Sequence, residues 1–249
     1  MKLSVLIPAH NEEGSIRETV HGVFDILVRE KILHEILVVN DHSTDRTEEI
    51  LNKVSEEVLS LRQIKNSLPN GFGYAVRCGL NNFNGDCVAL FMADASDSPD
   101  DLVKFYRTLI KGNYDAVFGS RFMPGGRTIE YPKVKLRLNR ITNNLIRLLF
   151  GLQYDDVTNA FKMYRAETIG GLKPFLAAHF NLTVELPLKV IVRGYSYTWV
   201  PNQWSNRKTG ATKLKLKEMG GRYMFIIFYC LMEKYLTRGD YLKKKYPRE

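Results

Sequence analysis

The 249-residue sequence predicts an α/β fold built on a mostly parallel central sheet. Three observations support this prediction. Short apolar runs alternate with stretches of helical periodicity over the first 120 residues, the apolar runs are nearly continuous, and turn residues separate the two kinds of segment. Continuous apolar strands that alternate with helices are typical of a parallel sheet covered on both faces.

Each expected element can be placed on the sequence. The expected strands cover residues 3–8, 35–40, 61–65, 86–93 and 114–120. The expected helices cover about 12–29, 45–59, 73–82 and 99–111. Pro99 supports the start of the last helix, because a proline fits the first turn, where its missing N–H would have no partner. Ligands of such sheets bind beyond the carboxyl ends of the strands, so the residues there are the first candidates for a site.

From Pro132 onward the pattern changes to amphipathic helices. One is expected over residues 134–150, with an apolar face and arginines along its flank. A second is expected from about Lys213 to Leu236, with a basic start and an aromatic-rich body. Such helices often lie in a bilayer interface. Packing of the same faces against the domain is the alternative interpretation.

The charge is unevenly distributed. The net charge of +9 is the sum of −7 over residues 1–100 and +16 over residues 101–249. This asymmetry favours metal and nucleotide chemistry in the first part and an anionic partner in the second. Nucleic acid, a phosphorylated lipid and an anionic bilayer all satisfy the second condition, and a merely solvated basic surface remains an alternative.

Other sequence features narrow the setting. The three cysteines are widely spaced, which favours reduced thiols in a cytosolic protein. The N-terminal apolar run is too short for a signal peptide, and no run approaches the ~20 apolar residues of a spanning helix. We therefore expect a cytoplasmic protein that does not cross a membrane by itself.

Acidic residues follow two of the expected strands. Asp41 comes directly after the second strand, where its carboxylate can accept a hydrogen bond from a base or sugar. Asp94 and Asp97 lie in the loop after the fourth strand, and two carboxylates so close suit a hard divalent cation. Helix capping is the alternative role for Asp97, and it explains Asp41 poorly.

Five segments, in this order, carry a resemblance to a known family: IPAHNEE, VVNDHSTDRT, FMADASDSP, GSRFMPGG and DDVTNAFKMY. Over roughly residues 3–214 the sequence resembles the family 2 glycosyltransferases, and more narrowly the polyprenyl-phosphate glycosyltransferases that include dolichyl-phosphate mannose synthases. The resemblance implies a GT-A (Rossmann-like) fold, inverting transfer from a nucleotide sugar, and a divalent metal, Mg²⁺ or Mn²⁺. It also implies a catalytic domain over residues 1–212 and a membrane-associating helix and basic tail over 213–249.

The resemblance assigns roles position by position. The residues implied to bind the nucleotide sugar are Pro8, Ala9, Asn11, Glu12 and Asp41. Those implied to surround the acceptor phosphate are Arg121, Arg137, Arg140, Arg207 and Lys213. The implied catalytic residues are Asp94, Asp97, Arg121 and Asp156, with Asp94 and Asp97 as the metal ligands. Glu185 is implied to lie in the helix where the family keeps a glutamate.

Two departures from the family pattern affect these roles. The family's D-A-D triplet reads Ala93-Asp94-Ala95 here, so both outer aspartates are alanine and Asp94 and Asp97 would have to rebuild the metal site. Lys162 replaces the arginine of the G-F-R segment, which keeps the charge but loses the bidentate fork.

The expected function is transfer of a hexose from GDP-mannose or a UDP-sugar to a polyprenyl or dolichyl phosphate, at the cytoplasmic face of a membrane. A lipid phosphate is already anionic and needs no strong base, whereas a sugar hydroxyl would need one, and Asp156 is the candidate. A transferase with a glycan hydroxyl acceptor in surface polysaccharide synthesis and a catalytically weakened membrane adaptor remain alternatives.

Two other classes fit less well. A dinucleotide-dependent oxidoreductase would need a G-x-G-x-x-G turn after the first strand, and only Gly14 is present there. A nucleic-acid-binding module fits the charge, but the basic residues interleave with apolar helix faces and carry no binding signature. We therefore expect a nucleotide sugar, a lipid phosphate and a membrane surface as partners, and no nucleic acid.

Overall fold

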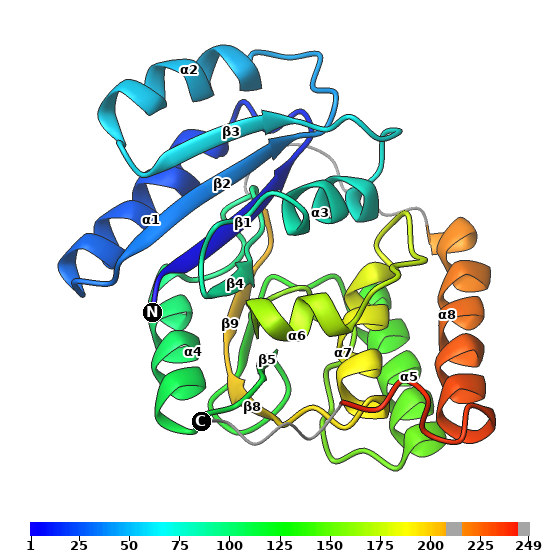
Figure 1. Ribbon diagram of the computed structural model, residues 1–249. Coiled ribbons are helices and arrows are strands. Elements are labelled where there is room, and N and C mark those ends of the chain that lie inside the picture. Colours follow the sequence, from blue (N-terminus) through cyan, green and yellow to red (C-terminus); the bar gives the residue numbers. More distant parts are fainter. Residues whose placement is uncertain (208–215, 244–249) are drawn as a thin grey trace.

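A seven-stranded sheet in the order β3-β2-β1-β4-β7-β5-β8 forms the centre of the protein (Figure 1). The computed structural model in which it is seen describes residues 1–207 and 216–243. Neighbouring strands are parallel except at β7, which runs antiparallel to β4 and to β5. The strands of this sheet are β1 (Leu3–Ala9), β2 (His34–Asn40), β3 (Leu61–Lys65), β4 (Cys87–Leu90), β5 (Ala116–Ser120), β7 (Lys162–Arg165) and β8 (Tyr197–Pro201).

A second, two-stranded sheet and eight helices complete the described part of the chain. The small sheet pairs β6 (Arg127–Ile129) with β9 (Gln203–Ser205) in parallel. The helices are α1 (Ile16–Arg29), α2 (Thr47–Glu57), α3 (Phe72–Leu80), α4 (Pro99–Lys111), α5 (Lys133–Phe150), α6 (Ala166–Gly171), α7 (Leu182–Val192) and α8 (Leu216–Leu236).

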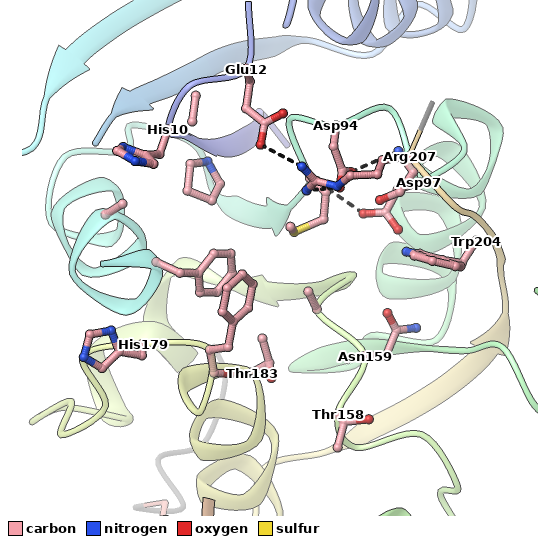
Figure 2. Close-up of a pocket in the computed structure, with 18 of the residues that line it drawn as sticks. His10, Glu12, Asp94, Asp97, Thr158, Asn159, His179, Thr183, Trp204 and Arg207 are labelled. Atoms are coloured by element: carbon pink, nitrogen blue, oxygen red, sulfur yellow. Dashed lines mark hydrogen bonds and ion pairs between the residues drawn. The ribbon is translucent and has the colours of Figure 1, made fainter. Parts of the chain in front are cut away.

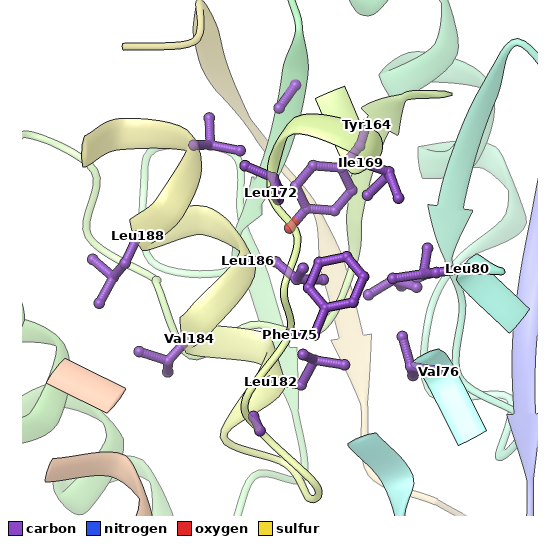
Figure 3. Close-up of a cluster of buried hydrophobic side chains, with 14 of the residues drawn as sticks. Val76, Leu80, Tyr164, Ile169, Leu172, Phe175, Leu182, Val184, Leu186 and Leu188 are labelled. Atoms are coloured by element: carbon purple, nitrogen blue, oxygen red, sulfur yellow. The ribbon is translucent and has the colours of Figure 1, made fainter. Parts of the chain in front are cut away.

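The sheet separates two hydrophobic clusters. Along β1, Val5 and Ile7 pack in the cluster formed with α1, α2 and α4, while Leu6 between them points into the other. This alternation is the period-two pattern of a strand with both faces buried. Helices α3, α5, α6, α7 and α8 cover the second face, and Figure 3 shows part of their cluster, with Phe175 and Leu186 beside Tyr164 of β7. The result is a three-layer α/β/α arrangement.

The predicted α/β fold with a mostly parallel sheet is confirmed, and the five predicted strands and their helices are present. Some limits differ. Strand β4 ends at Leu90 rather than at residue 93, because the chain turns there into the acidic loop. Helix α1 begins at Ile16 rather than at residue 12, because Glu12 and its neighbours form the turn that leaves β1. Strands β6–β9 and helix α6 were not predicted, and α7 was expected only as a helix around Glu185, without bounds.

The two amphipathic helices are present as α5 and α8, with a buried and an exposed side each. Helix α5 buries Ile146 and Phe150 but leaves Leu148 81% exposed. Helix α8 buries Ile226 and Cys230 in the cluster it shares with α7, and it exposes apolar residues on its other side. The division of the chain near residue 212 stays a prediction, since one side of α8 belongs to the core. Within the described residues, no helix combines the length and apolar character needed to span a bilayer.

Candidate active site

A cavity of about 410 Å³ opens at the carboxyl ends of β1, β2 and β4, where the sequence predicts a site (Figure 2). One wall consists of the loops that follow these strands and is acidic. The other is built from α5, α7, α8, the loop before β7 and the loops after β5 and β9, and it is rich in cations. We call these the acidic wall and the cationic wall. The acidic wall carries Glu12, Asp41, Asp94 and Asp97, and the cationic wall carries Arg121, Lys135, Arg207 and Arg222.

Asp41 lies at the end of β2 and is buried, yet it lines the cavity. Its carboxylate accepts hydrogen bonds from the Asn66 side chain (2.7 Å), the Asn70 side chain (3.3 Å) and the Gly71 N–H (2.9 Å). The carboxylate thus fixes the loop between β3 and α3 against the end of β2. Pro8, Ala9 and His10, at the end of β1, form the adjoining surface of the cavity.

Asn11 connects the loops after β1 and β2. Its side-chain oxygen accepts from the Thr44 N–H (2.7 Å), and its own N–H donates to the Ser43 hydroxyl (3.0 Å). Its backbone has a φ of 50°, a conformation that asparagine tolerates better than most residues. Asn11 does not line the cavity, unlike the other residues predicted to bind the nucleotide sugar. Its contribution to the site is to hold the two loops together.

The predicted metal ligands both face the cavity. Arg207 approaches Asp94 with an Nη2–Oδ2 distance of 2.7 Å and Glu12 with an Nη1–Oε1 distance of 3.6 Å, as the dashed lines in Figure 2 show. Asp97 is buried and accepts one backbone hydrogen bond, from Met92 (3.2 Å). Burial first, and then the charge of Asp94, raise the pKa of Asp97 to about 7. The cations and N–H groups that contact the acidic wall therefore do not fully compensate its negative charge.

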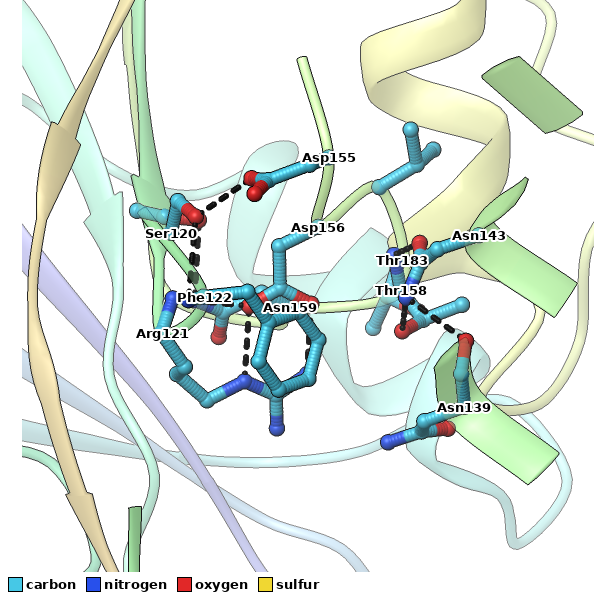
Figure 4. A network of polar contacts seen from close by, with 12 residues as sticks. Ser120, Arg121, Phe122, Asn139, Asn143, Asp155, Asp156, Thr158, Asn159 and Thr183 are labelled. Carbon is cyan, nitrogen blue, oxygen red and sulfur yellow. Dashed lines mark hydrogen bonds and ion pairs between the residues drawn. The ribbon is translucent and has the colours of Figure 1, made fainter. Parts of the chain in front are cut away.

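Arg121 and Asp156 form a buried ion pair at the base of the cationic wall (Figure 4). The guanidinium donates to the carboxylate through Nε (2.8 Å) and Nη2 (2.7 Å), and the Arg121 N–H adds a third bond (2.9 Å). Burial opposes the charge on Arg121, but Asp156 outweighs it, so the pKa of Arg121 is raised. Asp156 is fully buried and does not line the cavity, whereas Arg121 does. Asp156 thus has the position of a residue that orients Arg121.

Helix α5 brings a different set of residues to the cavity from those expected. Arg137 and Arg140 are exposed and lie outside the lining, and Arg140 stacks on the ring of Phe122. Lys135 and Asn139 line the cavity instead. Their spacing of four residues places them on one helical face. The sequence would have predicted both as site residues only if it had shown that this face is turned toward the cavity.

Lys135 is the residue of the cationic wall that sequence reasoning missed most clearly. Its ammonium lies 5.6 Å from the ring centroids of both Tyr131 and Trp204, a distance at which cations interact favourably with aromatic rings. Burial first, and then the charges of Arg121 and Arg207, lower the pKa of Lys135. Lys135 would therefore gain from an anionic ligand bound beside it in the cavity.

The floor of the cavity is the loop before β7. Asn143 of α5 donates to the Thr158 hydroxyl (2.9 Å) and accepts from the Thr158 N–H (3.1 Å), which joins the loop to α5 (Figure 4). Lys162 is fully buried beneath it and donates to the carbonyls of Val157 and Thr183. Burial lowers the pKa of Lys162 to about 7. Lys162 thus ties the floor to α7 and has no direct access to the cavity.

The remaining predicted residue of this region, Glu185, is a structural one. It is fully buried in α7, where it accepts from the N–H groups of Leu176 and Ala177 and pairs with Lys189 at 2.5 Å. Arg222 and Tyr223 of α8 were not predicted but line the cavity. Lys213 lies outside the described residues.

A cavity at the carboxyl ends of a parallel sheet, with an acidic and a cationic wall, is the arrangement of an α/β enzyme that handles charged ligands. The sequence matches the profile described as glycosyl transferase family 2 over residues 4–170. The protein belongs to this family and is a glycosyltransferase.

Curated relatives agree with this assignment. A probable glycosyltransferase, YdaM of Bacillus subtilis, is 38% identical over 43% of this chain and 26% of its own length. Undecaprenyl-phosphate mannosyltransferase of Micrococcus luteus is 25% identical over 86% of this chain and 88% of its own. Dolichol-phosphate mannosyltransferase of Pyrococcus furiosus is 28% identical over 87% and 60%. The chain thus spans about a quarter of YdaM, and likewise only 35% of the glycosyltransferase AglD of Haloferax volcanii.

Solved structures support the GT-A fold. Glucosyl-3-phosphoglycerate synthase of Mycobacterium tuberculosis in complex with phosphoglyceric acid superposes with a TM-score of 0.70 at 19% identity, over 94% of this chain and 79% of that one. The same enzyme was also solved with Mn²⁺, UDP and glucosyl-3-phosphoglycerate, and superposes with a TM-score of 0.68.

Proposed function

We propose that the protein transfers a hexose, with inversion, from GDP-mannose or a UDP-sugar to a polyprenyl or dolichyl phosphate. The observation that carries this proposal is the convergence of Arg121, Lys135 and Arg207 on one side of the cavity. A phosphate acceptor would bring an anion beside Lys135, whose pKa is lowered by burial and by these two arginines, whereas a neutral hydroxyl acceptor would not. The names of the relatives from Micrococcus luteus and Pyrococcus furiosus support the same acceptor class.

The chemistry needs little beyond positioning and charge. An oxygen of the acceptor phosphate attacks the anomeric carbon while the bond from that carbon to the donor diphosphate breaks, and the nucleoside diphosphate leaves. The nucleophile is already ionised, so no general base has to remove a proton. The cationic wall offsets the repulsion between the two phosphate groups and holds them in line. Asp156 could serve as a base only after breaking its three bonds to Arg121.

Asp94 and Asp97 are the candidate ligands for a divalent metal, Mg²⁺ or Mn²⁺. Within the described residues, no group of three or more His, Cys, Asp or Glu side chains could hold a metal ion by itself. The donor set nevertheless fits a hard cation, because two adjacent carboxylates, one with a raised pKa, gain from a positive charge. The ion would share Asp94 with Arg207, take its other ligands from the diphosphate and water, and neutralise the leaving group.

The outer surface of α5 and α8 fits a peripheral position on a membrane. Both helices expose large apolar side chains on the surface away from the core: Val134, Leu138, Ile141, Leu145, Leu148, Phe225, Phe228, Met232, Tyr235 and Leu236. Arg137 and Arg140 are exposed beside them and suit anionic headgroups. We propose that this surface, together with the basic tail, holds the enzyme at the cytoplasmic face of a membrane, next to its lipid acceptor.

The test compares a short polyprenyl phosphate with the matching polyprenol as acceptor, with a nucleotide sugar and Mn²⁺ present. We expect transfer to the phosphate only, and loss of transfer in EDTA and in the Asp94→Asn/Asp97→Asn variant. Equal use of the alcohol would instead favour a hydroxyl-acceptor transferase. A protein that binds vesicles but transfers to neither acceptor would be the membrane adaptor.

A further inference from the structure

Strand β9 brings the cationic wall into contact with the acidic wall. Trp204 of this strand and Arg207 just after it line the cavity, and Arg207 pairs with Asp94. The strand has three residues and belongs to the small sheet. Its partner there, β6, is itself exposed at Arg127 and Ile129. Pairing with β6 therefore does little to fix Trp204 and Arg207 relative to the core, and other contacts have to do so.

The loop after β4 supplies some of these contacts. The Ser205 N–H donates to the Ser96 carbonyl (2.9 Å), and Trp204 forms an antiparallel bridge with Asp97, beside which it lies in Figure 2. This loop ends where helix α4 begins, at Pro99. The candidate metal ligands and β9 are thus both joined to the start of α4.

Asp101, in the first turn of α4, holds the first residue of β9. It is 7% exposed, and its Oδ2 accepts a hydrogen bond from the Gln203 N–H at 2.7 Å. Lys104 lies one turn further along α4 and donates from Nζ to Asp101 Oδ1 (2.7 Å) and to the Pro201 carbonyl (2.8 Å). The two side chains therefore hold the backbone on both sides of Asn202, although neither lines the cavity.

The bond from Gln203 to Asp101 is charge-assisted, and burial of the carboxylate limits competition from water. The preceding residue, Asn202, has its own anchor, because its N–H donates to the Ser120 carbonyl (3.1 Å). Loss of the Asp101 carboxylate would therefore leave the end of β8 in place. It would leave β9 attached through β6 and the loop after β4, without its direct bond to α4.

We propose that Asp101 is a positioning residue for the transfer reaction, which acts through β9 to place Trp204 and Arg207 against the acidic wall. The inference rests on the proposed function, in which Arg207 helps to align the acceptor phosphate with the donor. Such a reaction depends on alignment, and a displacement of about 1 Å can reduce a rate roughly a hundredfold. Asp101 thus affects turnover without contact to a reacting atom.

The first experiment compares Asp101→Ala with Asp100→Ala. Both aspartates lie in the first turn of α4 and interact similarly with its dipole, but Asp100 is exposed and pairs with Arg29 at the surface (3.3 Å). With a nucleotide sugar and a polyprenyl phosphate, at a temperature where both variants are folded, Asp101→Ala should lower kcat about tenfold or more. Asp100→Ala should leave kcat unchanged. Asp101→Asn keeps an oxygen that can accept from the Gln203 N–H, and it should restore most of the rate.

The second experiment measures the position of β9 without catalysis. Trp199→Phe leaves Trp204 as the chain's only tryptophan, so its fluorescence reports on this strand. In this background Asp101→Ala should make Trp204 more easily quenched by acrylamide, because β9 has lost its bond to α4. Asp100→Ala should leave the quenching unchanged. A purely stabilising role of Asp101 would change neither the quenching nor kcat of the folded variant.

If Asp101→Ala does not fold, Lys104→Met takes its place, since the Lys104 side chain is 44% exposed. It removes the contacts to Asp101 and to the Pro201 carbonyl, and should change both quantities in the same direction, but less. A folded variant in which either the quenching or kcat stays at the wild-type value would overturn the inference. A wild type that transfers to no acceptor would overturn the proposed function, and the quenching comparison would still decide whether Asp101 positions β9.

Discussion

The acidic and cationic walls of the cavity are built in different ways. Each carboxylate of the acidic wall directly follows a strand or lies in the loop after it, as Asp41 follows β2 and Asp94 follows β4. The cations come from four separate places: Arg121 after β5, Lys135 in α5, Arg207 after β9 and Arg222 in α8. The acidic wall is thus a local consequence of a parallel sheet, and the cationic wall depends on long-range packing. This contrast predicts which substitutions harm the fold and which harm only the chemistry.

The largest expected effect is at the Arg121–Asp156 pair, where the cationic wall meets the core. Arg121→Ala leaves the Asp156 carboxylate buried without its partner, which should lower the free energy of unfolding by about 3–5 kcal/mol. Urea denaturation of the wild type and the variant measures this. Arg207→Ala is the control, since Arg207 is less buried, and should lose less than half as much. Equal losses would mean that Arg121 is not the anchor of the wall.

Next comes a pH effect at Lys162, below the floor of the cavity. Its pKa is about 7 in the folded protein, lowered by burial, against 10.5 for an ordinary lysine. Between these values the unfolded chain binds the proton and the folded chain does not, so stability should rise with pH. Relative to Lys162→Met, the wild type should gain about 2 kcal/mol between pH 7 and 9. Denaturation at several pH values tests this, and parallel curves would show that Lys162 stays charged when buried.

A third prediction concerns Lys135 and its exposed neighbour Arg137. Lys135→Ala should raise the KM for a polyprenyl phosphate about tenfold or more, because a charge-assisted bond in a partly dry cavity is lost. Nucleotide affinity should stay within about twofold of the wild type, since Lys135 lies on the opposite wall from Asp41. Arg137→Ala removes the same charge from the same helix and should leave the KM unchanged. If Arg137→Ala raised the KM more than Lys135→Ala, the sequence-based assignment of Arg137 to the acceptor phosphate would be supported instead.

The smallest expected effect is on membrane binding by the outer surface of α5. Leu148→Glu should reduce flotation with anionic vesicles while turnover on a short, water-soluble acceptor is retained, because Leu148 is far more exposed than buried. Leu59→Glu changes a leucine that is at least as exposed and does not belong to α5 or α8, and it serves as the control. Equal loss in both variants would show that the effect is one of net charge.

The contrast between the walls also explains how far sequence reasoning reached. Strand β2 is a continuous apolar run, so its end, and hence the position of Asp41, could be predicted directly. Lys135 could not be distinguished from Arg137 and Arg140, because the apolar face of α5 is turned outward over much of its length and gives no sign of where the cavity lies. The bounds of α7 could not be predicted from the pattern, because the helix is buried nearly all round and carries Pro187, which leaves no amphipathic period to recognise.

Strand β7 has a consequence for how the protein forms. In the sheet, β7 lies between β4 and β5. These two strands follow one another along the chain but do not pair with each other. When the chain has been synthesised only as far as Ser120, β4 and β5 therefore each have an unpaired edge, and their common partner β7 begins more than forty residues later. Closing so long a loop is slow compared with forming a helix or a hairpin. We expect a ribosome-bound intermediate in which the first layers are formed and the edges of β4 and β5 are open to aggregation until β7 joins these two strands. The other edge of β5 is covered only later, when β8 has been synthesised.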